Sequence, residues 1–560
     1  MKVLRERDQK TGVENINMVL TELKRLGLIK VESDPEDARK KLYTLIPLER
    51  RVMEQFKEAS KELTRGDLDS LLKKAADLIR TRVDYSFILI LLFYKRISDK
   101  WLGEYEQAYK EALEDGFSEE EAKVEAKNSI YHDFDIPEEF LWENIRKDPE
   151  KLPENFSKAM KAMAERNPDV RDIFETVDFV QFTSSRENAE ILRQLVELFS
   201  THSLRDVSPD ILGDAYEWLL RYFAPQKAKE GEVYTPREVI QLMVEILDPK
   251  PEEWVYDPAC GSGGMLISAF TYVEKKYGRK DAEKLFLRGQ EANAKTLALA
   301  KMNLYIHDIT NAKIAYGDTL LYPKFKKGES IETFDYVIAN PPWNQDGYNE
   351  QSLRKGEVWQ ERFKYGFTPR QSADWAWIQH MLASANDKGK VAVVIDNGAL
   401  FRGGKERVIR KAVIEENLLE AVILLPEKLF YNTGAPGAIM IFNRARPEDR
   451  KGKVLFINAS REYRQHPDVR KLNQLSQENI RKIVKAYREF SAEEGFSKVV
   501  PIEQIRDESD YNLNVSLYVF PHDEQEEIDV AEEWKEFQKL EQQFEEVKQK
   551  VKNYLEELGY

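Results

Sequence analysis

The four residues with the clearest chemical meaning are Asn340-Pro341-Pro342-Trp343, which directly follow the apolar segment at residues 334–339. The exocyclic amine of adenine is a poor nucleophile because its lone pair is delocalised into the ring. The amide oxygen of Asn340 and a carbonyl held by the rigid prolines would accept hydrogen bonds from this amine and favour its nucleophilic form. Trp343 would stack on an extruded base. The motif predicts chemistry on a base amine, and the alternative is a rigid surface loop.

Three other strand ends carry residues suited to a cofactor. Asp257 opens a glycine-rich turn, residues 257–264, between an expected strand and a helix, where the backbone can approach a ligand closely. Glu291 ends the next strand and can accept hydrogen bonds from ribose hydroxyls. Asp318 follows the third. Glu291 lies about 30 residues beyond the turn, against ~20 in the dinucleotide fingerprint, which disfavours NAD. We expect an adenosine-bearing cofactor; the alternative is three ordinary polar strand ends.

The elements that must position these residues are short apolar segments alternating with helical patterns. This alternation predicts an α/β fold with a doubly wound, Rossmann-like and mostly parallel sheet. The last two strands have no helix between them, so one antiparallel strand is expected. The candidate strands are EWVYD (253–257), LFLRGQE (285–291), AKIAY (312–316), FDYVIA (334–339), VAVVID (391–396), EAVILL (420–425) and GAIMIFN (437–443).

The chain divides by pattern into five parts. Residues 1–66 have the helix, strand, charged turn and strand of a winged-helix-like module, or of an ordinary α+β docking module. Residues 67–230 read as a large helical domain, 231–445 as the sheet domain and 446–522 as a mixed region. Residues 523–560 form a coiled-coil-like tail helix. Its apolar seam consists of Phe537, Leu540, Phe544, Val547, Val551, Tyr554 and Leu558.

Composition excludes several classes of protein. The net charge of −15 argues against coating nucleic acid through overall charge, although a local patch or a partner could still bind it. The single cysteine, Cys260, excludes an internal disulfide framework, and the six scattered histidines suggest no metal site. The longest apolar run, residues 87–94, is too short to span a bilayer, and the charged first residues show no secretory signal. We therefore expect a cytoplasmic protein without a membrane segment.

Two further segments have competing interpretations. Residues 344–370 interleave basic and aromatic residues beside Trp343, which suits a loop that contacts nucleic acid, or else a solvated insertion. Residues 398–406, GALFRGGKE, approach a phosphate-binding loop but lack its Gly-Lys-Ser/Thr order. ATP binding there is not expected.

The combination of DPACGSGG and NPPW resembles the S-adenosylmethionine-dependent amino-methyltransferases that make N6-methyladenine in DNA. Other segments are similar to modification (M) subunits of type I restriction-modification systems, so that the resemblance covers roughly residues 67–520. The Asn-Pro-Pro-aromatic motif alone also occurs in protein glutamine methyltransferases. The additional segments are DYSFILILLFYKRISDK (84–100), ILGDAYEWLLRYFA (211–224), GEVYTPREV (231–239) and DYNLNVSLYV (510–519).

The resemblance implies a role for each site residue. S-adenosyl-L-methionine would be the cofactor, with Asp257 on its methionine amine, Glu291 on its ribose and Asp318 near its adenine. Residues 232–237 would close over the methionine end, and residues 340–343 would handle the target base. The full cofactor set is Glu232, Val233, Tyr234, Thr235, Pro236, Arg237, Asp257, Ser262, Gly263, Gly264, Glu291 and Asp318.

The resemblance also implies a reaction and partners. The chain would transfer methyl to adenine N6 in DNA as a site-specific DNA-methyltransferase. A specificity (S) subunit would supply sequence choice, because only about 115 residues remain after the sheet, less than one typical domain. A restriction (R) subunit and a second M subunit would complete the assembly. The alternatives are a self-contained DNA adenine methyltransferase and a non-catalytic DNA-binding scaffold.

Overall fold

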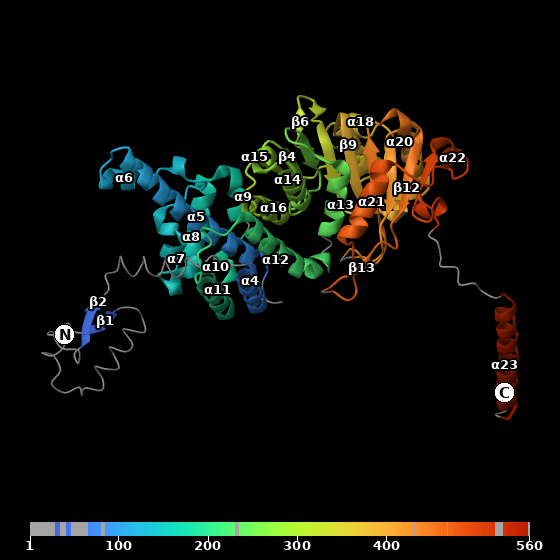
Figure 1. The fold of residues 1–560 in the computed structure, drawn as a ribbon, viewed down its shortest axis with the longest axis horizontal. Coiled ribbons are helices and arrows are strands. Elements are labelled where there is room, and N and C mark those ends of the chain that lie inside the picture. The colour runs from blue at the N-terminus through green and yellow to red at the C-terminus, as the bar shows by residue number, and fades with distance from the viewer. Residues whose placement is uncertain are drawn as a thin grey trace. The chain divides into compact units, whose positions relative to one another are not determined.

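The computed structural model describes residues 29–33, 41–45, 65–79, 84–175, 177–229, 235–430, 433–467, 469–520 and 530–557. The chain divides into two compact units (Figure 1). Unit 1 comprises Met1–Phe223 and Ala294–Thr310, and unit 2 comprises Ala224–Asn293 and Asn311–Tyr560.

Unit 1 is built from helices around one apolar core. The long helix α5 (Ser86–Glu114) carries the apolar run of residues 87–94, and Ile88 to Tyr94 are each at most 1% exposed. A helix covered on every side lies at the centre of its domain. No helix in the described ranges is long and apolar enough to cross a membrane. The other main helices are α4 (Arg65–Ile79), α6 (Glu119–Glu125), α7 (Trp142–Ile145), α8 (Leu152–Arg166), α9 (Arg171–Glu175), α10 (Phe179–Phe182), α11 (Arg186–Phe199), α12 (Pro209–Lys229) and α16 (Ala294–Ile306).

Helix α16 comes from the middle of the expected sheet domain, yet it belongs to unit 1. Its Leu299 and Met302 are buried in the same apolar core as α5. Lys301 forms an ion pair with Asp172 of α9. The sheet domain expected at residues 231–445 is therefore interrupted, because this helix satisfies its apolar face within the helical unit.

Unit 2 contains a nine-stranded sheet in the order β15-β12-β10-β11-β9-β8-β3-β4-β5. All seven expected strands are present, and β11 runs antiparallel to both neighbours, as predicted. The sheet continues past residue 445, because β12 pairs with β10 and β15 pairs with β12. The strands are β3 (Trp254–Asp257), β4 (Phe286–Glu291), β5 (Ala312–Tyr316), β8 (Phe334–Ala339), β9 (Ala385–Asp396), β10 (Leu419–Leu424), β11 (Gly437–Asn443), β12 (Lys453–Asn458) and β15 (Ser497–Pro501).

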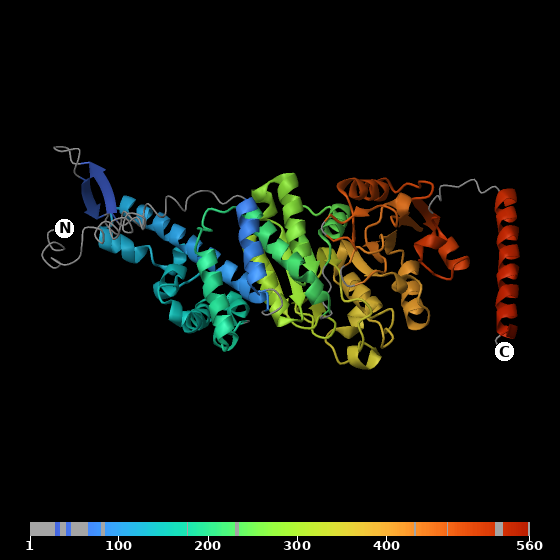
Figure 2. The same ribbon diagram turned by 90° about the horizontal axis from the view of Figure 1, so that it is seen from below.

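Helices cover both faces of this sheet (Figures 1 and 2). Alternate residues of β9, Val391, Val393 and Ile395, share an apolar core with α19 (Asp374–Ala383) and α20 (Gly404–Glu415). Side chains alternate between the faces of a strand, so the residues between them face the other layer. That layer holds α13 (Arg237–Leu247), which contacts both α14 (Gly264–Tyr277) and α21 (Gln477–Glu489). The expected doubly wound α/β fold is confirmed.

In an open α/β sheet, ligands bind at the edge where the parallel strands end. In this sheet that edge is formed by the carboxyl ends of β3, β4, β5, β8, β9, β10 and β12. Shorter elements accompany this framework. They are β6 (Lys326–Lys327), β7 (Ser330–Ile331), β13 (Arg464–Gln465), β14 (Asn473–Gln474), α15 (Arg279–Ala282), α17 (Glu350–Leu353), α18 (Trp359–Arg362) and α22 (Ile502–Asp507).

The two ends of the chain are described in part. Strands β1 (Ile29–Ser33) and β2 (Lys41–Leu45) pair antiparallel, as the expected hairpin of residues 1–66 requires. The helix expected before them lies outside the described residues. The tail forms α23 (Val530–Glu557), and its seam residues from Phe537 to Val551 are between 51% and 65% exposed. The side chains of Tyr554 and Leu558 lie outside the described residues.

Candidate active site

The first wall of the site is the buried end of β3. Asp257 is 2% exposed, and its carboxylate accepts a hydrogen bond from the Ala259 backbone N–H at 3.0 Å. Burial, with a further contribution from the negative charge of Glu291, raises the pKa of Asp257 to about 8. A positively charged ligand group at this position would lower that pKa again, because it would favour the ionised carboxylate.

The turn after Asp257 leads the backbone directly into α14. Gly263 has φ 82, in the left-handed region that favours glycine, and no side chain caps the helix that begins at Gly264. A Cβ atom built on Gly261 would meet no atom within 4 Å, so this turn borders open space. Uncapped N–H groups at a helix start beside open space can bind an anionic or polar ligand group.

Glu291 connects the end of β4 to this turn. One carboxylate oxygen accepts from the Gly261 N–H at 3.0 Å, and the other accepts from the Asn293 N–H at 2.7 Å. These two bonds fix the position of the carboxylate at the end of β4, and each carboxylate oxygen is able to accept more than one hydrogen bond. The next strand is tied to the same point, since the Gly317 N–H donates to the Glu291 carbonyl at 2.9 Å.

Asp318 follows β5 and is held by two donors. Its carboxylate accepts from the Leu321 N–H at 3.2 Å and from the Tyr348 hydroxyl at 2.8 Å. Burial and this hydrogen bond raise the pKa of Tyr348, so the phenol remains a neutral donor. Gln290 is fully buried, and its amide donates to the Gly317 carbonyl at 3.0 Å. Sequence reasoning missed Tyr348 and Gln290; the signal for Gln290 was a polar residue inside an apolar strand.

Asn340 ends β8 and is 8% exposed. Its Nδ2 donates to the Thr235 hydroxyl at 2.8 Å, and its Oδ1 accepts from the Trp343 indole N–H at 2.8 Å. An indole N–H only donates, so it identifies which end of the amide is the oxygen. Thr235 lies 105 residues before Asn340, so the structure brings two of the predicted segments into direct contact.

The Trp343 ring is packed on two sides. It meets Phe430 edge-to-face at a centroid distance of 4.8 Å. A Cβ atom on Gly437 would lie 2.9 Å from the Trp343 ring, so glycine at the start of β11 permits this close approach. Aromatic pairs in this geometry stabilise each other by about 0.5–1.5 kcal/mol beyond burial. Phe430 was not among the sequence candidates.

A buried ionic cluster supports the chain directly after Trp343. Asn344 adopts φ 52, its N–H donates to Asp374 at 2.9 Å, and its side chain donates to Asp396 at 3.0 Å. Arg402 forms ion pairs with Asp374 and with Glu406, both of which are 1% exposed. Arg402, from the glycine-containing segment 398–406, therefore supports the loop that carries Asn340.

The segment at residues 344–370 uses its cations largely within the fold. Arg362 is 1% exposed and donates to the backbone carbonyl of Thr319 at 3.0 Å. Arg354 stacks on Trp359 at 4.4 Å and on Phe367 at 4.7 Å. Three of its exposed cations also have acidic partners, in the pairs Arg354–Glu350, Lys364–Glu416 and Arg370–Asp346. These contacts account for most of the basic and aromatic residues that suggested a nucleic-acid contact.

The remaining sequence candidates fall in three groups. Pro236 and Arg237 lie at the start of α13, and Pro341 is buried between Asn340 and Trp343. Ser262 and Gly264 lie in the turn before α14. Glu232, Val233 and Tyr234 lie outside the described residues.

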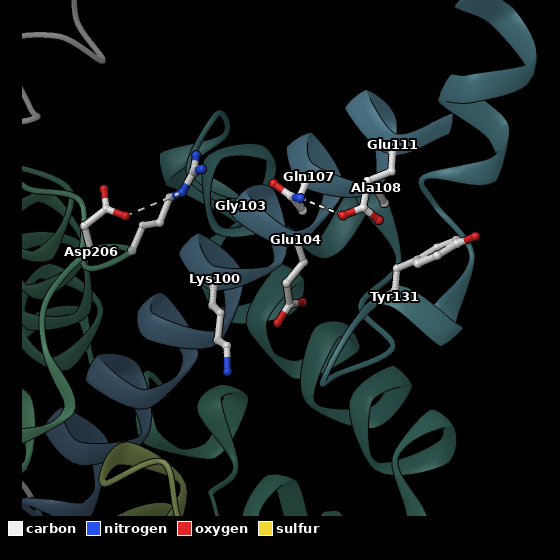
Figure 3. Close-up of a pocket in the computed structure, with 9 residues that line it drawn as sticks. Lys100, Gly103, Glu104, Gln107, Ala108, Glu111, Tyr131 and Asp206 are labelled. Carbon is white, nitrogen blue, oxygen red and sulfur yellow. Dashed lines mark hydrogen bonds and ion pairs between the residues drawn. The ribbon is translucent and has the colours of Figure 1, made fainter. Parts of the chain in front are cut away.

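The described residues also form a pocket that lies outside this edge. This pocket has a volume of about 420 Å³ and is lined by both acidic and basic side chains of α5 and its neighbours in unit 1 (Figure 3). It contains none of the residues predicted for the site. Within the described residues, no group of three or more His, Cys, Asp or Glu side chains could hold a metal ion.

Comparison with known proteins connects this geometry to a family. The family described as N-6 DNA Methylase matches residues 207–527, and the HsdM N-terminal domain matches residues 68–199. The chain is 45% identical over 562 residues to the type I restriction enzyme MjaVIII methylase subunit of Methanocaldococcus jannaschii, covering 99% of this chain and 94% of the relative. It is likewise 45% identical to the MjaVII methylase subunit of that organism, covering 97% and 91%.

A solved structure shares the fold. The type I restriction-modification methyltransferase subunit of Streptococcus thermophilus superposes with a TM-score of 0.70 at 27% identity, covering 81% of this chain and 100% of that one. The match to the HsdM N-terminal domain, the match to N-6 DNA Methylase and the near full-length identity to the methylase subunits point to the same family. The chain belongs to the adenine-specific N6 DNA methyltransferase family, among the methylase subunits of type I restriction enzymes.

Proposed function

We propose that this chain transfers the methyl group of S-adenosyl-L-methionine to N6 of adenine in DNA, as the methylase subunit of a type I restriction-modification system. The observation that carries the proposal is the arrangement at one sheet edge. Asn340 contacts Thr235 at 2.8 Å, and the carboxylates of Asp257, Glu291 and Asp318 end three adjacent parallel strands. This edge suits a cofactor at one end and a base at the other.

The donor set fits the cofactor. Asp257 would pair with the α-ammonium, because its buried carboxylate has an elevated pKa and gains from a cation. Glu291 would accept from the ribose hydroxyls, and Asp318, held in place by Tyr348, would lie at the adenine edge. Thr235, Pro236 and Arg237, with Glu232, Val233 and Tyr234, would close over the methionine end. The cofactor supplies a methyl group on a positively charged sulfur.

At the base, Asn340 Oδ1 would accept one N6–H bond, and the Pro341 carbonyl would accept the other. These contacts would turn the N6 lone pair toward the methyl carbon. When bound, the cofactor would supply the methyl carbon: the S–C electron pair would return to sulfur as N6 bonds the carbon, and N6 would then release one proton to water. Trp343 and Phe430 would form the aromatic side of the base pocket, and Pro342 would keep the loop rigid.

The assignment of partners rests on the tail helix. Five seam residues of α23 are more than half exposed, and a single helix cannot bury its own stripe. We assign this seam to the specificity subunit, which would choose the DNA sequence. A second methylase subunit and the restriction subunit would join the assembly, and an enzyme acting on genomic DNA would work in the cytoplasm.

The test is to sequence genomic DNA for N6-methyladenine in the host and in a host lacking this gene. Restoring the gene should restore methylation at defined sites, whereas the Asn340→Ala gene should not. Methylated DNA that persists without the gene would contradict the proposal. Expressing the chain with and without its specificity subunit separates a type I subunit from a self-contained methyltransferase, because only the latter would methylate alone.

A further inference from the structure

We propose that the hairpin of residues 460–474, between β12 and α21, is an arm that binds DNA phosphates beside the target base. This inference rests on the proposed function and deepens it, because it assigns a surface to the DNA backbone. The sequence patterns gave no sign of this hairpin, which falls in the mixed region at residues 446–522.

The hairpin is basic in an acidic chain. It holds four cationic residues against Glu462 and Asp468, a local charge of +2 where the whole chain carries −15. The charge of Glu462 is already balanced, because its carboxylate accepts from the Lys482 ammonium at 2.5 Å and from the Asn479 amide at 3.0 Å. The cationic residues are Arg461, Arg464, Arg470 and Lys471.

All four of these cations are exposed. Among the described residues, Arg464, Arg470 and Lys471 form no ion pair with a carboxylate. The Arg464 guanidinium donates to the neutral amide oxygen of Gln474 at 3.2 Å. Tyr463, beside Arg464, is 48% exposed. Exposed cations that the fold does not neutralise are available to bind phosphates.

The hairpin is a folded arm. Strands β13 and β14 pair antiparallel, with Arg464 opposite Gln474 and Gln465 opposite Asn473. The Gln465 side chain donates to the Arg470 carbonyl at 3.1 Å, and the His466 N–H donates to the Leu472 carbonyl at 2.9 Å. These hydrogen bonds hold Arg464 and Arg470 on the same hairpin.

The base of the arm is fixed next to the base pocket. The Asn473 N–H donates to the Lys428 carbonyl at 2.8 Å, and its side chain donates to the Glu427 carbonyl at 2.9 Å. Two residues beyond Lys428, Phe430 packs on Trp343. In Figure 1 the hairpin extends from the lower edge of unit 2, below α13 and α21. A duplex that presented its base to Asn340 would bring its backbone to this arm.

The segment at residues 344–370 makes the contrast clear. There Arg354 and Lys364 have acidic partners, and Arg362 is buried. On this comparison the hairpin, where Arg464, Arg470 and Lys471 have no acidic partner among the described residues, is the better phosphate surface.

The test uses the full chain co-purified with its specificity subunit and a duplex that carries its methylation site. The hairpin variant is Arg464→Gln, Arg470→Gln and Lys471→Gln together. The control removes the same number of positive charges, from exposed lysines near the amino ends of the strands. These are Lys250→Gln before β3, Lys280→Gln before β4 and Lys388→Gln in the first half of β9.

DNA affinity is measured by fluorescence anisotropy across a series of KCl concentrations. Each lost phosphate contact should reduce the slope of log affinity against log salt by about 0.9, so the hairpin variant should lose roughly 2.7. Its affinity at low salt should fall at least tenfold, and the control should match wild type. Affinity for S-adenosylhomocysteine should be unchanged in both. If the triple variant fails to fold, Arg464→Gln and Arg470→Gln alone should each lower the slope by about 0.9.

A hairpin variant whose salt slope equals that of the control would overturn the inference, even if its kcat were reduced. The proposed function fails in a different way, if the wild-type complex transfers no tritiated methyl group to any DNA. Because anisotropy reports binding and tritium transfer reports chemistry, the two failures are distinguishable.

Discussion

The elevated pKa of Asp257 gives a quantitative test of the cofactor site. With a pKa of about 8, most Asp257 carboxyls are protonated at neutral pH before ligand binds. Pairing with an α-ammonium requires the ionised form, so binding must release a proton. At pH 7 a group with this pKa is about nine-tenths protonated, and wild type should release roughly 0.9 proton per ligand bound. The affinity should rise by nearly tenfold per pH unit between about pH 6 and 7.5.

The measurement is isothermal calorimetry with S-adenosylhomocysteine, which keeps the same ammonium group. Titrations in buffers of different ionisation enthalpy give the number of protons released. Asp257→Asn serves as the matched control, because it keeps the acceptor oxygen for the Ala259 N–H and removes the titration. It should bind more weakly than wild type at pH 7.5 and show a flat pH dependence. Equal proton release in wild type and Asp257→Asn would refute the assignment.

The same pKa predicts the sign of a stability change without ligand. A buried carboxyl whose pKa is raised destabilises the fold at pH values above its unfolded pKa near 4, because the unfolded state ionises first. The loss of stability accumulates as pH rises from about 4 to 8, and then levels off. Thermal unfolding of wild type should therefore show a larger loss of Tm across this range than Asp257→Asn. A smaller loss in wild type would contradict the sign.

Four other outcomes follow from the contacts. Asn340→Ala should lower kcat in tritium transfer at least 10²–10³-fold and leave the cofactor Kd nearly unchanged, because the proposal assigns its amide oxygen to the base and not to the cofactor. Glu291→Ala should weaken cofactor binding by ~1.5–3 kcal/mol in calorimetry. Tyr348→Phe removes a 2.8 Å donor from Asp318 and should raise the cofactor KM several-fold without changing the affinity for DNA. Deleting residues 523–560 should leave cofactor binding intact and abolish co-purification with the specificity subunit. The results that would contradict these expectations are an unchanged kcat for Asn340→Ala, an unchanged cofactor affinity for Glu291→Ala, an unchanged cofactor KM for Tyr348→Phe, and co-purification that survives the deletion.

The sequence predicted the parts of the fold that follow from periodicity. β5, β8 and β11 have the expected bounds, because a short apolar segment flanked by turn residues marks a strand locally. β12 and β15 were missed. Residues 454–457 of β12 are an uninterrupted apolar run and therefore a local strand signal, but the position of β12 beside β10 depends on tertiary pairing that no short window of sequence shows.

At the site, residues whose functional groups could react or bind a ligand were predictable from the sequence. The residues that hold them in position through hydrogen bonds were not. Asn340 and Glu291 stand out because their types and positions suit a reaction. Tyr348 and Gln290 are ordinary residues until the fold places them beside Asp318 and Gly317. Their role depends on contacts between segments about 30 residues apart, and no local pattern encodes such contacts.

Helix α16 has a consequence for how the cofactor site is built. Glu291 accepts from the Asn293 N–H at 2.7 Å, and α16 begins at the very next residue. From there the chain belongs to unit 1, where Tyr216 donates to the Leu299 carbonyl at 3.5 Å and Lys301 pairs with Asp172. The carboxylate assigned to the ribose is thus covalently tied, through Ala292 and Asn293, to a helix anchored in the other unit. A boundary drawn from alternating strands and helices places α16 with the sheet, because its sequence is that of any crossover helix. Its buried partners, and not its own pattern, assign it to the helical unit.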